Sequence, residues 1–172
     1  MNLKIFLAAI TLFFSISAIA QNYDIERSKY TKALKYHKNK NYKEFDKLKK
    51  ELVNYPLYSD LEYKSLHRKR FLNDEKIIQF IKNYKNSYSS EKAYVNLIYR
   101  LSSTNKIDKL INNYKKTESI DLHCLYLRAR IKKNSTEDIG KEIIPVWLSA
   151  KSQPKACDYV FKWFYKNKKL SD

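Results

Sequence analysis

Apolar residues recur along most of the chain at the spacing of one helical face, and short polar breaks separate these recurrences. Tyr30, Ala33, Leu34 and His37 are spaced three, one and three residues apart, as expected on one side of an α-helix. Similar segments follow, each ending at a polar break or at a proline such as Pro56, because a proline ring disfavours helical geometry at the preceding residue. The pattern predicts roughly seven to nine helices of about 10–16 residues each.

Polar residues at the breaks indicate where several helices begin. Asn73-Asp74 is expected to cap one helix, and Ser89-Ser90 precedes the next. Thr136 is expected to cap a later helix. Pro154 suits the first turn of the last helix, where a missing backbone N–H costs nothing.

Short helices joined by short breaks predict an all-α solenoid, in which stacked helical hairpins bury their apolar faces against their neighbours. A compact helical bundle is the alternative. No strict repeat of about 34 or 40 residues is present, so the common consensus repeat families are not indicated. The chain contains one glycine and three prolines, which argues against a turn-rich β-sandwich or β-barrel.

The N-terminus has the pattern of a secretory signal peptide. Lys4 supplies a positive charge, an uncharged apolar run covers residues 5–16, and Ala18-Ile19-Ala20 provides the small residues that signal peptidase needs. We therefore expect a signal peptide at residues 1–20, cleaved after Ala20, and one domain at residues 21–172. The alternative is an uncleaved anchor, although the run is shorter than the roughly 20 residues that span a bilayer. Charges interrupt every later apolar stretch, so no stable membrane span is expected after cleavage.

The chain is strongly basic, with a formal net charge of +17, which becomes +16 when Lys4 is removed with the signal peptide. Clustered basic residues are typical of nucleic-acid binding. Here they are spread along the whole chain, and export separates the protein from cytoplasmic nucleic acid, so no nucleic-acid partner is expected. A codon bias toward A and T explains the lysine excess, and attraction to anionic envelope material is the alternative.

Two cysteines, Cys124 and Cys157, remain after signal cleavage, and an even number of cysteines in an oxidising compartment favours a disulfide. Metal binding competes poorly, because only His123 lies near a cysteine in the sequence and no second ligand pair is present. No metal ion or cofactor is therefore expected.

Candidate catalytic residues are few. The sequence has no glycine-rich phosphate loop, no nucleophile elbow and no zinc-binding histidine pair. Its histidines, His37, His67 and His123, lie far apart in predicted helices. Asp60 and Glu62 are close in sequence, but residues two apart on a helix do not share a face. Asp60 lies one turn before Lys64, and a surface ion pair is the simpler interpretation.

Three segments carry a resemblance to a known family. The first is Tyr55-Pro56-Leu57-Tyr58-Ser59-Asp60-Leu61-Glu62-Tyr63. The second is Phe80-Ile81-x-x-Tyr84 with the following helix. The third begins with Cys124-x-Tyr126-x-x-Ala129-Arg130 and includes Trp147, Pro154 and Asp158. Together they resemble the N-terminal superhelical, U-shaped region of soluble lytic murein transglycosylases, which are periplasmic enzymes that cleave peptidoglycan glycan strands.

The resemblance implies a right-handed α-superhelix, a periplasmic location, a role near peptidoglycan and a bridge between Cys124 and Cys157. Members of this family carry their chemistry in a C-terminal lysozyme-like domain, and the 172 residues are expected to contain only the superhelical region. Their catalytic glutamate precedes a serine, but Glu118-Ser119 falls inside the superhelical region without the expected downstream context, so no catalytic residue is assigned. The glycine usual after the Ala129 helix is missing, and Asn134 is expected to cap that helix instead.

The function expected from these observations is a non-catalytic scaffold that binds or positions peptidoglycan glycan strands. The chain is expected to be truncated from, split from or independent of a catalytic domain, which in the split case is a separately encoded partner. One alternative is a helical-repeat adaptor for another envelope protein. The other is an enzyme that uses its own carboxylate, with Asp60, Glu62 and Glu118 as the candidates.

Overall fold

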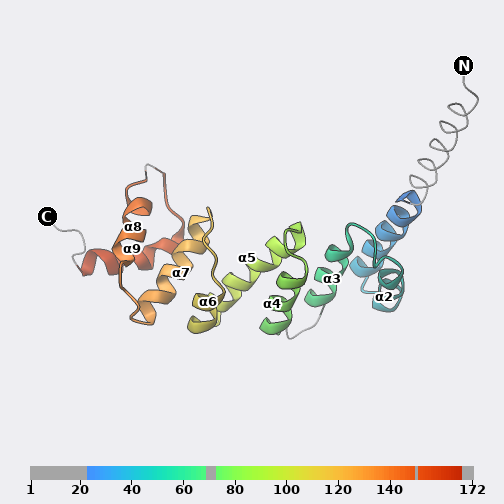
Figure 1. The fold of residues 1–172 in the computed structure, drawn as a ribbon, viewed down its shortest axis with the longest axis horizontal. Coiled ribbons are helices and arrows are strands. Elements are labelled where there is room, and N and C mark those ends of the chain that lie inside the picture. Colours follow the sequence, from blue (N-terminus) through green and yellow to red (C-terminus); the bar gives the residue numbers. More distant parts are fainter. Residues whose placement is uncertain (1–22, 69–72, 150, 168–172) are drawn as a thin grey trace, which may run out of the picture. The chain divides into compact units, whose positions relative to one another are not determined.

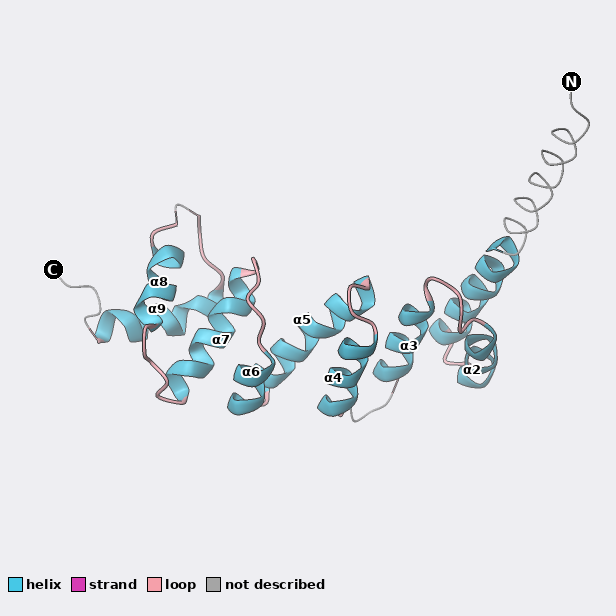
Figure 2. Cartoon of the chain, viewed as in Figure 1, coloured by secondary structure: helices cyan, strands magenta, loops and turns pink. Residues whose placement is uncertain are grey.

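The structure is a computed structural model that describes residues 23–68, 73–149 and 151–167 (Figure 1). All regular elements in these ranges are helical (Figure 2). The signal peptide expected at residues 1–20 lies outside the described residues and stays a prediction. The helices are residues 23–38, α2 Tyr42–Glu51, α3 Tyr58–His67, α4 Asp74–Asn83, α5 Tyr88–Ser103, α6 Ile107–Asn113, α7 Ile120–Lys132, α8 Ile139–Trp147, the 3-10 turn η1 Lys155–Cys157, and α9 Asp158–Lys166.

The chain divides into two compact units, residues 1–72 and 73–172. In the first unit, helix 23–38, α2 and α3 share one small core. Ala33, Phe45, Leu52 and Leu61 are fully buried in it, and Tyr55 is nearly so. Burying a leucine or phenylalanine side chain stabilises a fold by about 1.5–3 kcal/mol, so these few residues account for the association of the three helices.

The second unit begins with α4 packed on α5, and α5 in turn contacts α6 and α7. The expected position of Ser89-Ser90 before the helix is wrong, because α5 begins at Tyr88 and Ser87 is its N-cap. The Ser87 hydroxyl accepts the N–H of Ser90 at 3.1 Å. Ser90 is buried inside the helix, and its hydroxyl donates to the Ile81 carbonyl at 3.3 Å, which ties α5 to α4.

A buried carboxylate joins the first three helices of this unit. The side chain of Asp74 is only 2% exposed, and it accepts from Arg100 Nε at 2.8 Å and from Lys106 Nζ. Burial alone would raise the pKa of the Asp74 carboxyl, but the hydrogen bonds from Lys106 and Arg100 outweigh burial and hold this pKa below its ordinary value. Asp74 therefore stays ionised and links the start of α4 to α5 and to the start of α6.

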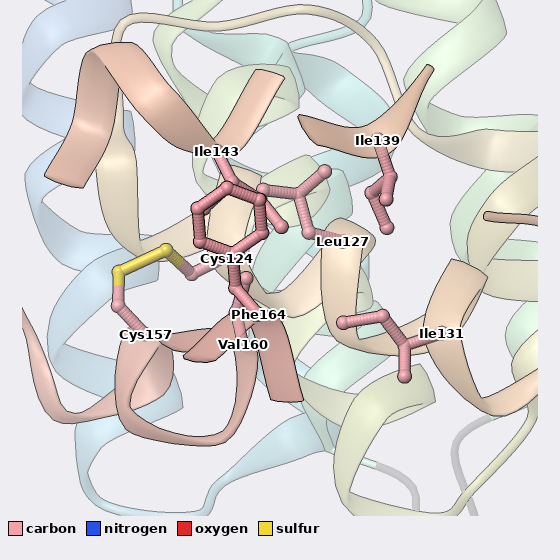
Figure 3. Close-up of a cluster of buried hydrophobic side chains, with 8 residues drawn as sticks. All are labelled: Cys124, Leu127, Ile131, Ile139, Ile143, Cys157, Val160 and Phe164. Atoms are coloured by element: carbon pink, nitrogen blue, oxygen red, sulfur yellow. A yellow bond between two sulfur atoms is a disulfide. The ribbon is translucent and has the colours of Figure 1, made fainter. Parts of the chain in front are cut away.

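The C-terminal part of the second unit has its own core, formed by α7, α8, η1 and α9. Figure 3 shows its side chains converging from these elements, with the disulfide between Cys124 and Cys157 at one side of the cluster. The Cα atoms of these two cysteines lie 4.9 Å apart, and both residues are fully buried. The other members are Leu127, Ile131, Ile139, Ile143, Val160 and Phe164.

Several helices end in the left-handed conformation that glycine usually adopts, although the chain has only one glycine. Asn134 has φ 59°, and its N–H donates to the Ile131 carbonyl while the next N–H, of Ser135, donates to Arg130. This is the paired hydrogen-bond pattern of a Schellman cap, with asparagine replacing glycine. Lys40, at φ 60°, closes helix 23–38 in the same way.

At the starts of helices, one expected cap is present and one is wrong. Asn73 caps α4, because its Oδ1 accepts the N–H of Glu75 at 2.8 Å. Thr136 does not cap α8, whose N-cap position is Asp138 at φ 55° with no side-chain cap. Instead the carbonyl of Thr136 accepts the N–H of Ile139 at 3.2 Å, so a backbone turn begins this helix.

Across the described residues, we find no helix that is both long enough and apolar enough to cross a membrane.

Candidate functional site

The residues of the first family-like segment lie mostly inside the first unit. Tyr55 is buried with its ring 5.4 Å from that of Tyr30, and Leu61 and Tyr63 are also buried. Pro56 and Leu57 are exposed in the turn before α3. The contacts of this segment are therefore mainly core contacts between the helices of the first unit.

The carboxylates of this segment are already engaged in hydrogen bonds. Glu62 accepts from the Tyr58 hydroxyl at 2.7 Å and from Lys49 Nζ at 2.7 Å. Asp60 accepts from the Tyr30 hydroxyl at 2.8 Å and lies 3.7 Å from Lys64 Nζ.

Burial, and after it the hydrogen bond to Asp60, raises the pKa of Tyr30. Asp60 and Glu62 thus connect neighbouring helices of the first unit.

The other expected positions are spread over the second unit. Trp147 ends α8, is 40% exposed and packs edge-on against Phe161 at 4.9 Å. Pro154 directly precedes η1, and Asp158 is the exposed first residue of α9. The roles of these three residues stay predictions.

Glu118 and Ser119 lie in the loop between α6 and α7. Glu118 is exposed. Ser119 is the N-cap of α7, and its hydroxyl accepts the N–H of Leu122 at 3.5 Å. This geometry gives the serine a capping role.

The same loop, residues 114–119, is held in place by a tyrosine of α5. The Tyr94 hydroxyl accepts the N–H of Lys115 at 2.7 Å and donates to the carbonyl of Lys115 at 3.2 Å. Burial raises the pKa of Tyr94, so its hydroxyl keeps its proton and continues to donate. The ammonium group of Lys115 also lies 5.8 Å from the centre of the Tyr94 ring, a cation–π distance.

Tyr114, the residue before Lys115, is part of an aromatic cluster. The rings of Tyr114 and Tyr126 stack with centroids 4.1 Å apart and planes 9° apart. The Tyr114 hydroxyl lies 3.0 Å from Nδ1 of His123, one turn before Tyr126 on α7. Burial raises the pKa of Tyr114 to about 12.

The imidazole of His123 lies between a phenol and a carboxylate. Its Nε2 is 3.9 Å from Glu142 of α8, and the same carboxylate accepts a hydrogen bond from Arg130. Burial lowers the pKa of His123, with Lys116 and Arg130 adding to the effect and Glu142 opposing it. A neutral ring with its proton on Nε2, toward Glu142, lets Nδ1 accept from the Tyr114 hydroxyl.

These residues line a hollow of about 580 Å³, which we call the aromatic hollow. Its volume falls in the range of small-ligand sites, and it combines aromatic faces with a few fixed polar groups. Lys116 and Lys141 add positive charge at its edge. The other residues that line the aromatic hollow are Tyr114, His123, Tyr126, Glu142, Pro145 and Val146.

The sequence interpretation did not find this hollow. His123, Tyr126 and Arg130 lie at i, i+3 and i+7 on α7, a spacing that signals one helical face. Tyr114 and Glu142 come from other elements, and no periodicity connects them to that face. In the described part of the chain, no group of three or more His, Cys, Asp or Glu side chains is placed to hold a metal ion.

The fold is similar to solved structures of a lytic transglycosylase. The 70 kDa soluble lytic transglycosylase from Escherichia coli superposes with a TM-score of 0.75 at 22% sequence identity over 87% of this chain. This chain shares the fold of part of that enzyme. A complex of the 70 kDa soluble lytic transglycosylase with bulgecin A gives a TM-score of 0.73 at 23% identity, again over 87% of the chain.

The likeness confirms the predicted fold class, an all-α superhelix of short helical hairpins, and the family resemblance at the level of fold. The chain spans 24% of the length of each of these solved chains, so their activity is not transferred with the fold. No protein-family model and no curated protein sequence matches the chain.

Proposed function

We propose that this protein is an exported, periplasmic and non-catalytic helical scaffold that binds the glycan strands of peptidoglycan. The observation that carries the proposal is the aromatic hollow, where stacked tyrosine rings lie beside hydrogen-bonding groups in a fold similar to part of a lytic transglycosylase. The excess of positive charge supports a partner in the anionic cell envelope.

A sugar ring has apolar C–H faces and polar hydroxyl edges. Tyrosine offers the matching combination, an apolar ring face and a polar hydroxyl. In the aromatic hollow, His123, Glu142 and Lys116 lie around the tyrosine pair and provide donors and acceptors for hydroxyl groups. The hollow therefore suits a short stretch of polysaccharide.

Binding without cleavage is the more economical proposal. Glycoside cleavage requires a carboxylic acid that protonates the leaving oxygen and commonly a second carboxylate opposite it. In the aromatic hollow the carboxylate is Glu142, and Arg130 already donates to it. Asp60 and Glu62 are engaged by Tyr30, Tyr58 and Lys49 in the other unit.

The test is sedimentation of the protein, purified from the envelope of producing cells, with isolated peptidoglycan. We expect the wild-type protein to sediment with peptidoglycan and to release no soluble muropeptides, as measured by mass spectrometry. Tyr126→Leu keeps an apolar side chain but removes the stacked ring, and it should weaken binding about tenfold, or 1.4 kcal/mol.

Tyr159→Leu is the matched control. Tyr126 and Tyr159 each have an arginine over the ring, Arg130 at 5.8 Å and Arg128 at 5.2 Å, but Tyr159 is not among the residues lining the aromatic hollow. The control should bind as the wild type does. Thermal unfolding of both variants checks that they remain folded. A wild-type protein that stays in the supernatant would overturn the proposal.

A second candidate function, an adaptor for another envelope protein, is favoured by exposed apolar side chains at the end of α8. Ile144, Trp147 and Leu148 are 38%, 40% and 73% exposed. Chemical crosslinking in whole cells distinguishes the two functions. Crosslinks from this segment to one protein, together with no sedimentation with peptidoglycan, would favour the adaptor.

A further inference from the structure

On another side of the 114–119 loop, two hollows of about 530 and 450 Å³ share four lining residues. The shared residues are Ile81, Lys85, Tyr94 and Lys115, so the two hollows form one groove, which we call the lysine groove. It lies between α4, α5, the end of α6 and the loop. It adjoins the aromatic hollow, since Tyr114 and Lys116 line both.

The lysine groove carries a clear excess of positive charge. Four lysines line it, Lys82, Lys85, Lys115 and Lys116, against one carboxylate, Glu91, which leaves a formal charge of +3. The floor includes apolar side chains such as Ile81. A surface of this kind favours an anionic partner that also carries alkyl groups.

The lysines of the groove are available for such a partner. In the described part of the chain, Lys82, Lys85 and Lys116 are exposed and form no ion pair. Lys106 and Lys109, on nearby α6 and its N-cap, are instead committed to Asp74 and Glu75.

Lys115 is fixed in position by its backbone hydrogen bonds to Tyr94 and by the Tyr94 ring under its ammonium group. Part of the ordering cost of binding is therefore already met in the free protein.

The geometry points to the carboxylates of a short acidic peptide as the ligand of the lysine groove. This rests on the proposed function, because peptidoglycan carries such peptides along its glycan strands. We propose that the aromatic hollow contacts the sugar while the lysine groove holds the carboxylates of an attached peptide. The protein thereby distinguishes peptide-bearing strands from bare strands.

Two features favour a peptide carboxylate over a phosphate. No arginine lines the groove, whereas bidentate recognition of phosphate favours the planar guanidinium group. The apolar floor also gives the alkyl parts of a peptide a surface to cover, which the backbone of a phosphate polymer would leave exposed to water.

The experiment compares intact peptidoglycan with glycan strands from which an amidase has removed the peptides. The wild-type protein should bind the intact polymer about tenfold more tightly at low salt, and added salt should reduce this difference. A triple variant, Lys82→Gln, Lys85→Gln and Lys116→Gln, should bind both polymers with the lower affinity. Lys115 is left unchanged because it also holds the loop.

A second triple variant is the charge-matched control: Lys43→Gln, Lys47→Gln and Lys50→Gln on α2. These lysines are also exposed, so both variants lose three positive charges from exposed positions. The control should keep the preference for intact peptidoglycan.

Equal wild-type binding to both polymers would overturn this inference and leave the proposed function standing. Loss of the preference in the control variant would also overturn it, because net charge alone would then explain binding. Stronger competition by inorganic polyphosphate or by phosphatidylglycerol vesicles than by a soluble acidic peptide would assign the groove to phosphate instead. Failure to bind either polymer would overturn the proposed function itself.

Discussion

Breaking the disulfide between Cys124 and Cys157 should destabilise the C-terminal part of the second unit. The two cysteines are 33 residues apart and fully buried. In the chain-entropy model, a crosslink that closes a loop of this length removes about 12.5 cal/mol/K of entropy from the unfolded chain, or about 3.7 kcal/mol at 25 °C. Reduction should lower the free energy of unfolding by about that amount.

Tryptophan fluorescence during urea unfolding measures this effect locally. The chain has two tryptophans, Trp147 on α8 and Trp163 on α9, and both lie in helices that surround the disulfide-linked core. With an m-value of about 1–3 kcal/mol/M, a loss of about 3.7 kcal/mol shifts the midpoint by roughly 1–4 M urea.

The control is the double variant Cys124→Ala and Cys157→Ala, which should unfold at low urea whether or not reductant is present. Each substitution also removes a buried sulfur atom, so the variant should be slightly less stable than the reduced wild type. A reductant-induced loss below about 1 kcal/mol in the wild type would refute the reasoning, because loop closure would then not be the main contribution of this bridge.

Three further predictions concern single side chains, each measured by urea unfolding followed by circular dichroism. Asp74→Asn removes the carboxylate shared by Arg100 and Lys106 and should cost about 1–3 kcal/mol. Because the pKa of Asp74 is lowered in the fold, its contribution is present above the ordinary value of 3.8 and is lost as pH falls below it. An unchanged stability at pH 7 would contradict this. His123 has a lowered pKa, so the unfolded chain binds more protons than the fold below the ordinary value of 6.5, and stability should fall as pH decreases from there. His123→Gln should remove that part of the pH dependence, and a slope retained in the variant would assign it to another group. Lys40→Gly should stabilise the protein by about 1 kcal/mol, because lysine at φ 60° carries a steric cost that glycine avoids. A loss of stability would mean that the Lys40 side chain has a larger role.

The sequence predicted structure best where that structure depends on residues close together in the chain, as at the ends of helices. Asn73 was predicted as a cap and has this role, because capping needs only a side-chain oxygen within reach of the next turn. Asn134 was predicted to end α7 and does so at φ 59°. The cap at Thr136 was wrong because the segment before α8 offers several polar residues of similar capping propensity. The burial of Ile139 and Ile143 then favours a later start.

The candidate sites could not be predicted in this way. The lysine groove depends on the bond between Tyr94 and Lys115, which are 21 residues apart. The aromatic hollow depends on Tyr114 stacking on Tyr126 and on Glu142 reaching the histidine from another helix. Lysines at such positions look the same in sequence as lysines on any solvated helix face, since only the fold decides which of them share a groove.

The family-like motifs share a few residues with the candidate sites, such as Ile81 and Tyr126, but many of the other motif residues lie in the core. Tyr55, Leu61, Cys124 and Cys157 are buried, so packing constrains their identity and their spacing. Such residues can preserve a fold at 22% identity without preserving a ligand. Exposed lysines carry no packing constraint, and a groove built from them can change while the helices remain. The resemblance therefore supports the scaffold, and the binding proposals depend on the residues around the 114–119 loop.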